Sequence, residues 1–320
     1  MIYALQFPAG FEKWIEVKIG QLPKLKVIKV ESGLILIDST ESEESKLKQL
    51  GWFSSIELVF IYGSYKDIDQ LINSIKLNDL SDLSLSAKTF QLRTFVNNQP
   101  AKIDDITRSK LLNLISNKYR IKYSAHRPDM VFSIKLRQSG FGYFGVSLSS
   151  DHNKYQKGEL RLAAASLLTS LADLPGDPLI LEAFGGYGGL TRALIKLNPK
   201  SLKVIEKDKD LAKMLRSRLG KTTIVINDDA VNYLNENQDA YDLIIADPPW
   251  GNYSKIEDDL YLNFLLAAKL KLTDNGNIVI ISSDKLKLEQ AVSKSGLNLN
   301  LSLDVLISGK KARVYSLSND

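Results

Sequence analysis

The chain has 320 residues, of which 44% are hydrophobic and 25% charged, and its net charge at neutral pH is +5. It contains no cysteine, which excludes disulfides, thiolate zinc sites and a cysteine nucleophile. Only two histidines are present, so we expect no metal site. No apolar run approaches the ~20 residues that span a bilayer, and the N-terminus has no basic segment followed by an apolar one. We therefore expect a cytoplasmic protein that makes no membrane contact.

The first 150 residues predict strands that alternate with helices and also follow one another directly. Residues 129–149 predict a β-hairpin with its turn at or near Ser139-Gly140. Neighbouring strands of this kind are typical of an α+β domain rather than a doubly wound one. Further strands are predicted at residues 1–7, 26–30, 33–39, 56–65, 89–96 and 120–124, and helices at residues 10–22, 42–53, 67–76 and 102–119.

Positive charge is concentrated in residues 84–137, which hold eleven Lys or Arg against three Asp or Glu. Such a local field suits a polyanion such as nucleic acid. A solvated basic face is the alternative interpretation of the same charges. The polar, turn-rich residues 151–158 come next, and we expect them to form a linker.

From residue 159 the pattern changes to apolar strands alternating with amphipathic helices. This alternation predicts a parallel, doubly wound sheet, in which ligands bind outside the carboxyl ends of the strands. Strands are predicted at residues 179–184, 201–208, 222–228, 241–249 and 276–283, followed by two strand-like segments at 299–308 and 311–318. Helices are predicted at residues 159–174, 190–197, 211–220, 230–236, 260–272 and 287–296.

The first strand of this half ends in the glycine-rich turn EAFGGYGG, which begins at Glu182. Glycines let the chain turn sharply and let a ligand touch the backbone. Thr191 stands where a dinucleotide fingerprint needs its third glycine, and no Gly-Lys-Ser/Thr follows to make a phosphate loop. A carboxylate at Glu182 would repel a pyrophosphate but can hold an ammonium group, so we expect a ligand other than a dinucleotide.

Acids also follow the next two strands. Glu206, about 18 residues after Gly188, can accept two hydrogen bonds from a ribose diol. Asp229, followed by the backbone N–H of Ala230, suits the N6 and N1 edge of an adenine. Each acid alone could equally cap a helix, but three of them at successive strand ends favour a ligand site.

The fourth strand ends in ADPPWG, residues 246–251, where two consecutive prolines forbid both helix and ladder pairing. Together with the acids and the glycine turn, this motif resembles the class I S-adenosylmethionine-dependent methyltransferases that modify an exocyclic amine. The resemblance implies a Rossmann-like α/β domain, S-adenosylmethionine as cofactor and an amine as methyl acceptor. It assigns the cofactor to Glu182, Phe184, Gly186, Gly188, Glu206, Lys207, Asp229, Ala230 and Asp247, and catalysis to Asp247, Pro248, Pro249 and Trp250.

The chemistry implied for this motif is the activation of a poor nucleophile, because the lone pair of a base amine is delocalised into the ring. The Asp247 carboxylate and the Pro248 carbonyl would accept the two amine hydrogens and aim the lone pair at the methyl sulfonium. Trp250 would offer a face on which a flipped or unpaired base stacks, worth roughly 1–3 kcal/mol. The rate enhancement would come mainly from positioning and charge complementarity.

The first half resembles a THUMP domain with a preceding ferredoxin-like segment, because a strand, a helix, Pro128-Asp129 and a two-stranded ending occur in that order. The resemblance implies RNA binding, with Arg93, Lys118, Arg120, Lys122 and Arg127 as candidates. The predicted domains are a ferredoxin-like segment at 1–65, a THUMP-like RNA-binding domain at 66–150, a linker at 151–158 and a methyltransferase domain at 159–320. This combination resembles the THUMP-containing guanosine-N2 methyltransferases of tRNA and ribosomal RNA, and most of all the tRNA guanosine-10 type, so tRNA is the favoured partner.

Several alternatives stay open. Trp250 departs from the Tyr usual in that group and resembles RNA adenine-N6 enzymes, which leaves the target base undecided. Ribosomal RNA is the alternative substrate, and a catalytically inactive RNA-binding protein is the alternative of a different class. The acids retained at all four strand ends argue against an inactive protein. A nicotinamide oxidoreductase is disfavoured by Thr191 and by the two prolines. Gly185 and Gly189 also depart from the Cys and Thr common in the family.

Overall fold

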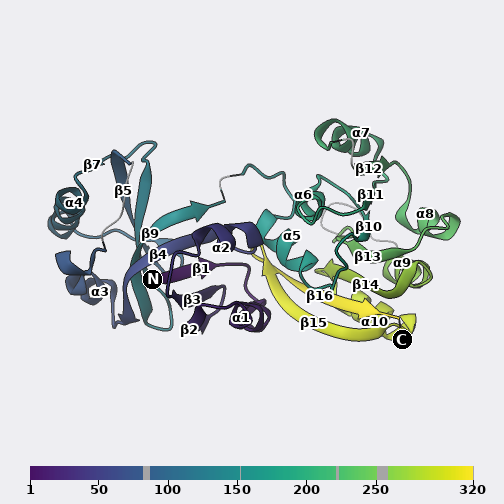
Figure 1. The fold of residues 1–320 in the computed structure, drawn as a ribbon, viewed down its shortest axis with the longest axis horizontal. Helices are drawn as coiled ribbons and strands as arrows, with labels where there is room; N and C mark the ends of the chain where they lie inside the picture. The colour runs from purple at the N-terminus through teal and green to yellow at the C-terminus, as the bar shows by residue number, and fades with distance from the viewer. Residues whose placement is uncertain (82–86, 152, 221–222, 251–258, 320) are drawn as a thin grey trace. The chain divides into compact units, whose positions relative to one another are not determined.

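The computed structural model describes residues 1–81, 87–151, 153–220, 223–250 and 259–319. Residues 84–86 of the basic segment, His152 in the predicted linker, Thr222 at the start of a predicted strand and Gly251 after Trp250 lie outside the described residues. The chain forms two compact units (Figure 1), which we describe separately. The first comprises Met1–Gln6, Glu16–Lys48 and Ser55–Asp151; the second comprises Phe7–Ile15, Gln49–Ser54 and His152–Asp320.

The first unit is built on a mixed sheet whose described strands run in the order β2-β3-β1-β4-β9-β8-β5-β6, with β7 beside β5. All neighbours are antiparallel except that β5 runs parallel to β8 and β7. The strands are β1 (Ile2–Gln6), β2 (Leu25–Glu31), β3 (Leu34–Ser39), β4 (Ser55–Ser64), β5 (Thr89–Val96), β6 (Gln99–Pro100), β7 (Lys122–Tyr123), β8 (Met130–Leu136) and β9 (Phe141–Ser150).

The predicted hairpin is confirmed by β8 and β9, which pair antiparallel around Gly140 at φ +81°. Because β4 pairs with β9, one sheet runs through both of the segments predicted as separate N-terminal domains, and that subdivision stays a prediction. The helices in this part of the chain are α1 (Glu12–Gly20), α2 (Glu44–Leu50), α3 (Ile68–Ser74), the 3₁₀ turn η1 (Leu77–Asp79) and α4 (Asp105–Tyr119).

The second unit is a Rossmann-like α/β fold, as predicted. Its described strands run in the order β12-β11-β10-β13-β14-β16-β15, and β10 to β14 are parallel while β16 is antiparallel to both of its neighbours. The order reverses between β10 and β13, and a crevice for ligands opens at such a switch point. The strands are β10 (Leu179–Ala183), β11 (Ser201–Ile205), β12 (Thr223–Ile226), β13 (Tyr241–Ala246), β14 (Leu272–Ser282), β15 (Asn298–Ile307) and β16 (Lys310–Ser318).

Helices connect these strands, and the first of them is much shorter than predicted. Residues 159–174 predict a single helix, but α5 covers only Leu162–Thr169, because Gly158 takes φ +89° and Arg161 is extended at the helix N-cap. The other helices are α6 (Gly189–Ile195), α7 (Lys209–Arg218), α8 (Ala230–Glu236), α9 (Leu260–Lys269) and α10 (Lys285–Ser295). No helix in the described ranges is long and apolar enough to cross a membrane.

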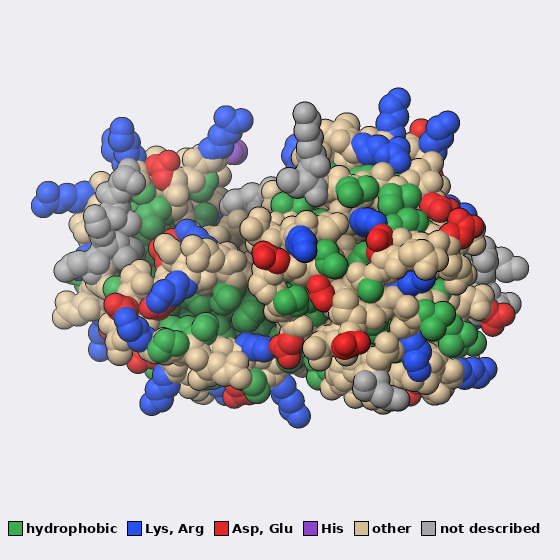
Figure 2. All heavy atoms as spheres, turned by 45° about the vertical axis from the view of Figure 1, so that its right-hand side comes forward, with side chains coloured by type: hydrophobic (Ala, Val, Ile, Leu, Met, Phe, Trp, Pro, Cys, Tyr) green, Lys and Arg blue, Asp and Glu red, His purple; other side chains and the backbone are tan. Residues whose placement is uncertain are grey.

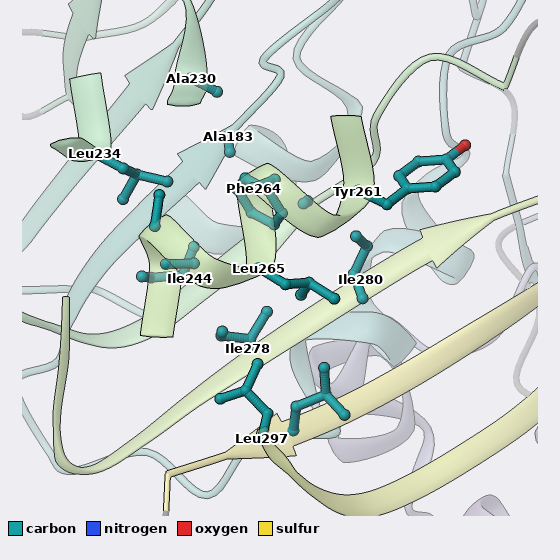
Figure 3. Close-up of a cluster of buried hydrophobic side chains, with 14 of the residues drawn as sticks. Ala183, Ala230, Leu234, Ile244, Tyr261, Phe264, Leu265, Ile278, Ile280 and Leu297 are labelled. Carbon is teal, nitrogen blue, oxygen red and sulfur yellow. The ribbon is translucent and has the colours of Figure 1, made fainter. Parts of the chain in front are cut away.

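A buried apolar cluster fixes the strand ends of the second unit (Figure 3). Side chains from β13 and β14 meet Phe264 and Leu265 of α9, and all of them are almost fully buried. Burial of each such side chain contributes roughly 1.5–3 kcal/mol. Tyr261 belongs to the same cluster, but its hydroxyl points away from the apolar side chains. The cluster therefore holds the carboxyl ends of the central strands in place and presents one polar group beside them.

Candidate active site

A cavity of about 980 Å³ opens at the carboxyl ends of β10, β11 and β13, entirely within the second unit. It brings together most of the residues predicted for the cofactor and for catalysis. Of these, only Gly188 is absent from its lining. The predicted residues on the lining are Glu182, Phe184, Gly186, Glu206, Lys207, Asp229, Ala230, Asp247, Pro248, Pro249 and Trp250.

The glycine turn between β10 and α6 is built from unusual backbone conformations. Phe184, Gly186 and Gly188 all have positive φ, at +66°, +51° and +84°. A Cβ on Gly185 would lie 2.5 Å from Val204 Cγ1, and a Cβ on Gly189 would lie 2.7 Å from the Leu160 carbonyl oxygen. Close packing thus explains the two glycines that depart from the family pattern. Gly185 packs against β11, and Gly189 packs against the backbone before α5.

Glu206, at the end of β11, is 8% exposed and already bound to the backbone. Its Oε2 accepts from the Gly186 amide at 2.6 Å and its Oε1 from the Asp208 amide at 2.7 Å. The first bond ties the glycine turn to the neighbouring strand. A carboxylate offers about four acceptor positions, so these two bonds leave capacity for the diol of a ribose.

Glu182, at the end of β10, is fully buried, and Thr191 Oγ1 donates to its Oε2 at 2.6 Å. Its other oxygen, Oε1, is buried without a hydrogen-bond partner among the described residues, and the residue lines the cavity. Burial raises the pKa of Glu182 to about 8, and the negative charges of Asp247 and Glu206 add to the rise against the opposing Thr191 bond. An unpaired buried oxygen is costly, so this group could accept a hydrogen bond from a ligand donor.

Asp229 caps α8, because its Oδ1 accepts from the amides of Val231 and Asn232 at 3.0 and 3.3 Å. Its Oδ2 lies 3.1 Å from Lys207 Nζ. Burial acts to raise the pKa of Asp229, but the bonds from Lys207 and from the two amides outweigh it and hold the pKa below its usual value. Asp229 is therefore an ionised acceptor at the rim of the cavity, and capping and ligand binding are compatible at this position.

Asp247 follows β13, and its Oδ1 accepts a hydrogen bond from the Trp250 indole Nε1 at 2.8 Å. Burial raises the pKa of Asp247 to about 7, and the indole bond acts against the rise. The Tyr261 hydroxyl approaches the Pro249 carbonyl oxygen at 3.4 Å and Ser282 Oγ at 2.7 Å. Two contacts thus flank the two prolines. One is the hydrogen bond from Trp250 to Asp247, and the other is the approach of Tyr261, which is itself packed in the core.

These residues fit S-adenosylmethionine. Its ammonium can meet the unpaired Glu182 oxygen, its ribose diol the remaining acceptor positions of Glu206, and its adenine the edge formed by Asp229 and Ala230. Within the glycine turn, Gly186 leaves room for a ligand beside the backbone, because a Cβ there would meet no atom closer than 3.9 Å. Its sulfonium supplies an electrophilic methyl group, and among the described residues no cation is a leading influence on the pKa of Glu182 or of Asp247.

Two segments of the cavity lining were not predicted as part of a site. One precedes α5 and contributes Tyr155 to Arg161; the other is the β15–β16 turn, which contributes Ile307, Ser308 and Lys310. Residues 155–158 of the first segment were predicted only as a linker, and residues 159–161 only as the start of a helix. Tyr187 in the glycine turn and Asp228 beside Asp229 were also missed, although both stand next to predicted positions.

The residues predicted to bind RNA lie elsewhere, in the first unit. Arg93 is exposed on β5, Lys118 is half-buried at the end of α4, and Arg120, Lys122 and Arg127 are exposed in β7 and the turns around it. Arg120 and Arg127 take positive φ, at +55° and +45°. Figure 2 shows Lys and Arg side chains projecting from the surface of the molecule, on the left side of that view as well as the right.

The fold and the cavity define a class I methyltransferase that uses S-adenosylmethionine. A family model described as "Methyltransferase small domain" matches residues 145–304, half of the chain, and the protein belongs to this family.

Similar proteins include two solved structures that share the fold over the whole chain. TrmN from Thermus thermophilus superposes with a TM-score of 0.78 at 20% identity and covers 100% of this chain and 99% of its own. A predicted N6-adenine-specific DNA methylase from Listeria monocytogenes gives a TM-score of 0.66 at 13% identity, covering 100% and 96%. Among curated proteins, ribosomal RNA small subunit methyltransferase A of Pelagibacter ubique is 39% identical over 62 residues, which is 19% of this chain and 23% of that protein.

Proposed function

We propose that this methyltransferase transfers a methyl group from S-adenosylmethionine to the exocyclic N2 amine of a guanosine in RNA, with tRNA favoured over ribosomal RNA. The observation that carries the proposal is the Asp247–Trp250 segment in the same cavity as Glu182, Glu206 and Asp229. A ribosomal RNA methyltransferase among the similar proteins supports RNA as the substrate. The resemblance of the first half to a THUMP domain supports a structured RNA such as tRNA.

The geometry supports a defined role for Asp247. One of its oxygens accepts from the Trp250 indole, which leaves Oδ2 for an amine hydrogen of the base. The Pro248 carbonyl would accept the second hydrogen, and with both held the nitrogen lone pair points away from them toward the methyl donor. When the new N–C bond forms and the C–S bond breaks, the nitrogen must lose a proton. A carboxylate with a pKa of about 7 can take it and release it to solvent near neutral pH.

We further propose that the first unit grips the RNA. Arg93, Lys118, Arg120, Lys122 and Arg127 would contact phosphates, and residues 66–150 would act as the THUMP-like domain, joined by residues 151–158 to the methyltransferase domain. Charge reversal at Lys118, Arg120 and Lys122 is expected to weaken RNA binding and to lower its salt dependence. Unchanged affinity for RNA would show that these three residues are solvent-exposed cations that do not contact RNA.

The deciding experiment is incubation of the full chain with labelled S-adenosylmethionine and unmodified tRNA or ribosomal RNA, followed by nucleoside mass spectrometry. N2-methylguanosine is the expected product. N6-methyladenosine would instead support the alternative favoured by Trp250, and absence of any methylated nucleoside from every RNA would overturn the proposal. Asp247→Ala serves as the matched variant, because it should abolish transfer while leaving cofactor binding nearly intact.

A further inference from the structure

The cavity of the second unit is lined by both charges, mostly from different segments; Lys207 at a strand end pairs with Asp229, and Glu159 before α5 pairs with Arg192. The acids Glu182, Glu206, Asp229 and Asp247 all come from the strand ends. Exposed cations line the same cavity from two other segments. These are Lys157 and Arg161 before α5, and Lys310 at the start of β16. We call these three residues the basic rim.

The segment that carries Lys157 and Arg161 is held in a defined position. Glu159 forms an ion pair with Arg192 of α6 and accepts from the Gln156 amide at 2.7 Å. The Arg192 guanidinium also lies 5.1 Å from the ring centre of Tyr155, whose hydroxyl accepts from the Leu162 amide at 3.0 Å. With the close backbone approach at Gly189, these contacts fix where the two cations emerge.

Lys310 is fixed in a different way. It pairs with Ile307 across a two-residue turn in which Ser308 and Gly309 have φ of +49° and +82°. Positive φ at both central residues defines the tight hairpin turns that match the twist of paired strands. The cation therefore leaves a rigid β-ladder at the edge of the cavity rather than a long loop.

We propose that the basic rim binds the phosphate groups that flank the target nucleotide. The inference rests on the proposed function, because an RNA base must leave its stack to reach an atom deep in an enzyme, while its phosphates stay at the entrance. The acids at the strand ends repel phosphate, so an anion can approach only where cations offset them. Lys157, Arg161 and Lys310 provide that offset on segments that need no reordering, and Arg161 can bind a phosphate through two N–H groups at once.

The test compares two triple variants of the full chain. The rim variant is Lys157→Ala, Arg161→Ala and Lys310→Ala; the control variant is Lys200→Ala, Lys213→Ala and Lys294→Ala, which removes three exposed cations of the same unit that do not line the cavity. Binding of a fluorescent single-stranded RNA is measured across a salt series, and binding of S-adenosylmethionine by calorimetry. Each phosphate contact contributes about 0.7 to the salt slope for single strands, so the rim variant should lose about 2 in slope and at least tenfold in affinity at low salt. Its cofactor affinity should stay within twofold, which also shows that it folds, and the control variant should match the wild type.

An unchanged salt slope in the rim variant would overturn the inference. A weakened cofactor affinity with unchanged RNA affinity would also overturn it, and would assign the cations to the cofactor's carboxylate instead. Product analysis separates this inference from the proposed function. If the wild type methylates RNA but the rim variant binds RNA like the control, the role of the basic rim is contradicted and the proposed function is not. If the wild type methylates no RNA, the proposed function itself is contradicted.

Discussion

The indole bond between Trp250 and Asp247 can be tested by Trp250→Phe, which keeps an aromatic face and removes the N–H donor. That bond lowers the pKa of Asp247, whose value of about 7 is set mainly by burial. A hydrogen bond to a charged acceptor contributes about 1.5–3 kcal/mol, and one pKa unit corresponds to about 1.4 kcal/mol. Because Asp247 is only half-buried, we take the lower end and expect its pKa to rise by about one unit in the variant.

The assay is the single-turnover rate of methyl transfer between pH 5.5 and 9. If the ionised carboxylate is the active form, the rate falls as the pH drops through the pKa, and in Trp250→Phe this fall should occur about one pH unit higher. Trp52→Phe is the control, because Trp52 does not line the cavity. An acid limb at the same pH in the wild type and in Trp250→Phe would refute the role given to the indole bond, whatever happens to the rate at the plateau.

Three further predictions follow from the site. Glu182→Gln should stabilise the cofactor-free protein at pH 8 but not at pH 4. The pKa of Glu182 is raised in the folded protein, so ionisation of this group lowers the stability as the pH rises above the unfolded pKa. Thermal melts at the two pH values would show the difference, and a variant that melts like the wild type at pH 8 contradicts this. The same variant should bind S-adenosylmethionine at least tenfold more weakly in calorimetry. Tyr261→Phe should lower kcat by about three- to tenfold with little change in cofactor affinity, because it removes the hydroxyl beside the Pro249 carbonyl. An unaltered kcat would show that the position of the two prolines does not depend on this hydroxyl. Gly189→Ala should destabilise the protein by about 1–3 kcal/mol in denaturant unfolding, whereas Gly176→Ala, with nothing within 4 Å, should be close to neutral.

The strand-end acids could be predicted from the sequence because each follows an apolar run directly. In a parallel sheet the carboxyl ends of the strands share one edge, so Glu182, Glu206 and Asp247 meet in one cavity although they are far apart in the chain. No comparable rule links Glu159 to Arg192, a pair that crosses 33 residues and anchors the segment before α5. The acidic side of the cavity is therefore predictable from the sequence, whereas the basic rim is not.

The hydrogen bond of Trp250 was missed for a related reason. A residue type indicates what a side chain can do, and an indole can stack on a base or donate through its nitrogen. Which of these it does depends on the turn that follows the two prolines, and the structure directs the indole N–H to Asp247. The ring remains half-buried, so stacking on a base stays a prediction, while the link to the acid is a contact that the motif alone did not indicate.

The acids of the cavity also bear on how the enzyme would distinguish its cofactor from the by-product. Glu182 and Asp247 both have pKa values raised by burial, and the charge of Asp247 raises that of Glu182 further. Keeping both ionised costs free energy in the empty protein, and a positively charged ligand recovers that cost when it binds. Methyl transfer removes the positive charge from sulfur, so the same carboxylates would attract the by-product slightly less than the cofactor, a small difference that agrees with the nearly intact cofactor binding expected of Asp247→Ala. With the proposed site, burial of the acids would lower the stability of the free protein and would favour binding of the charged methyl donor and release of its neutral-sulfur product.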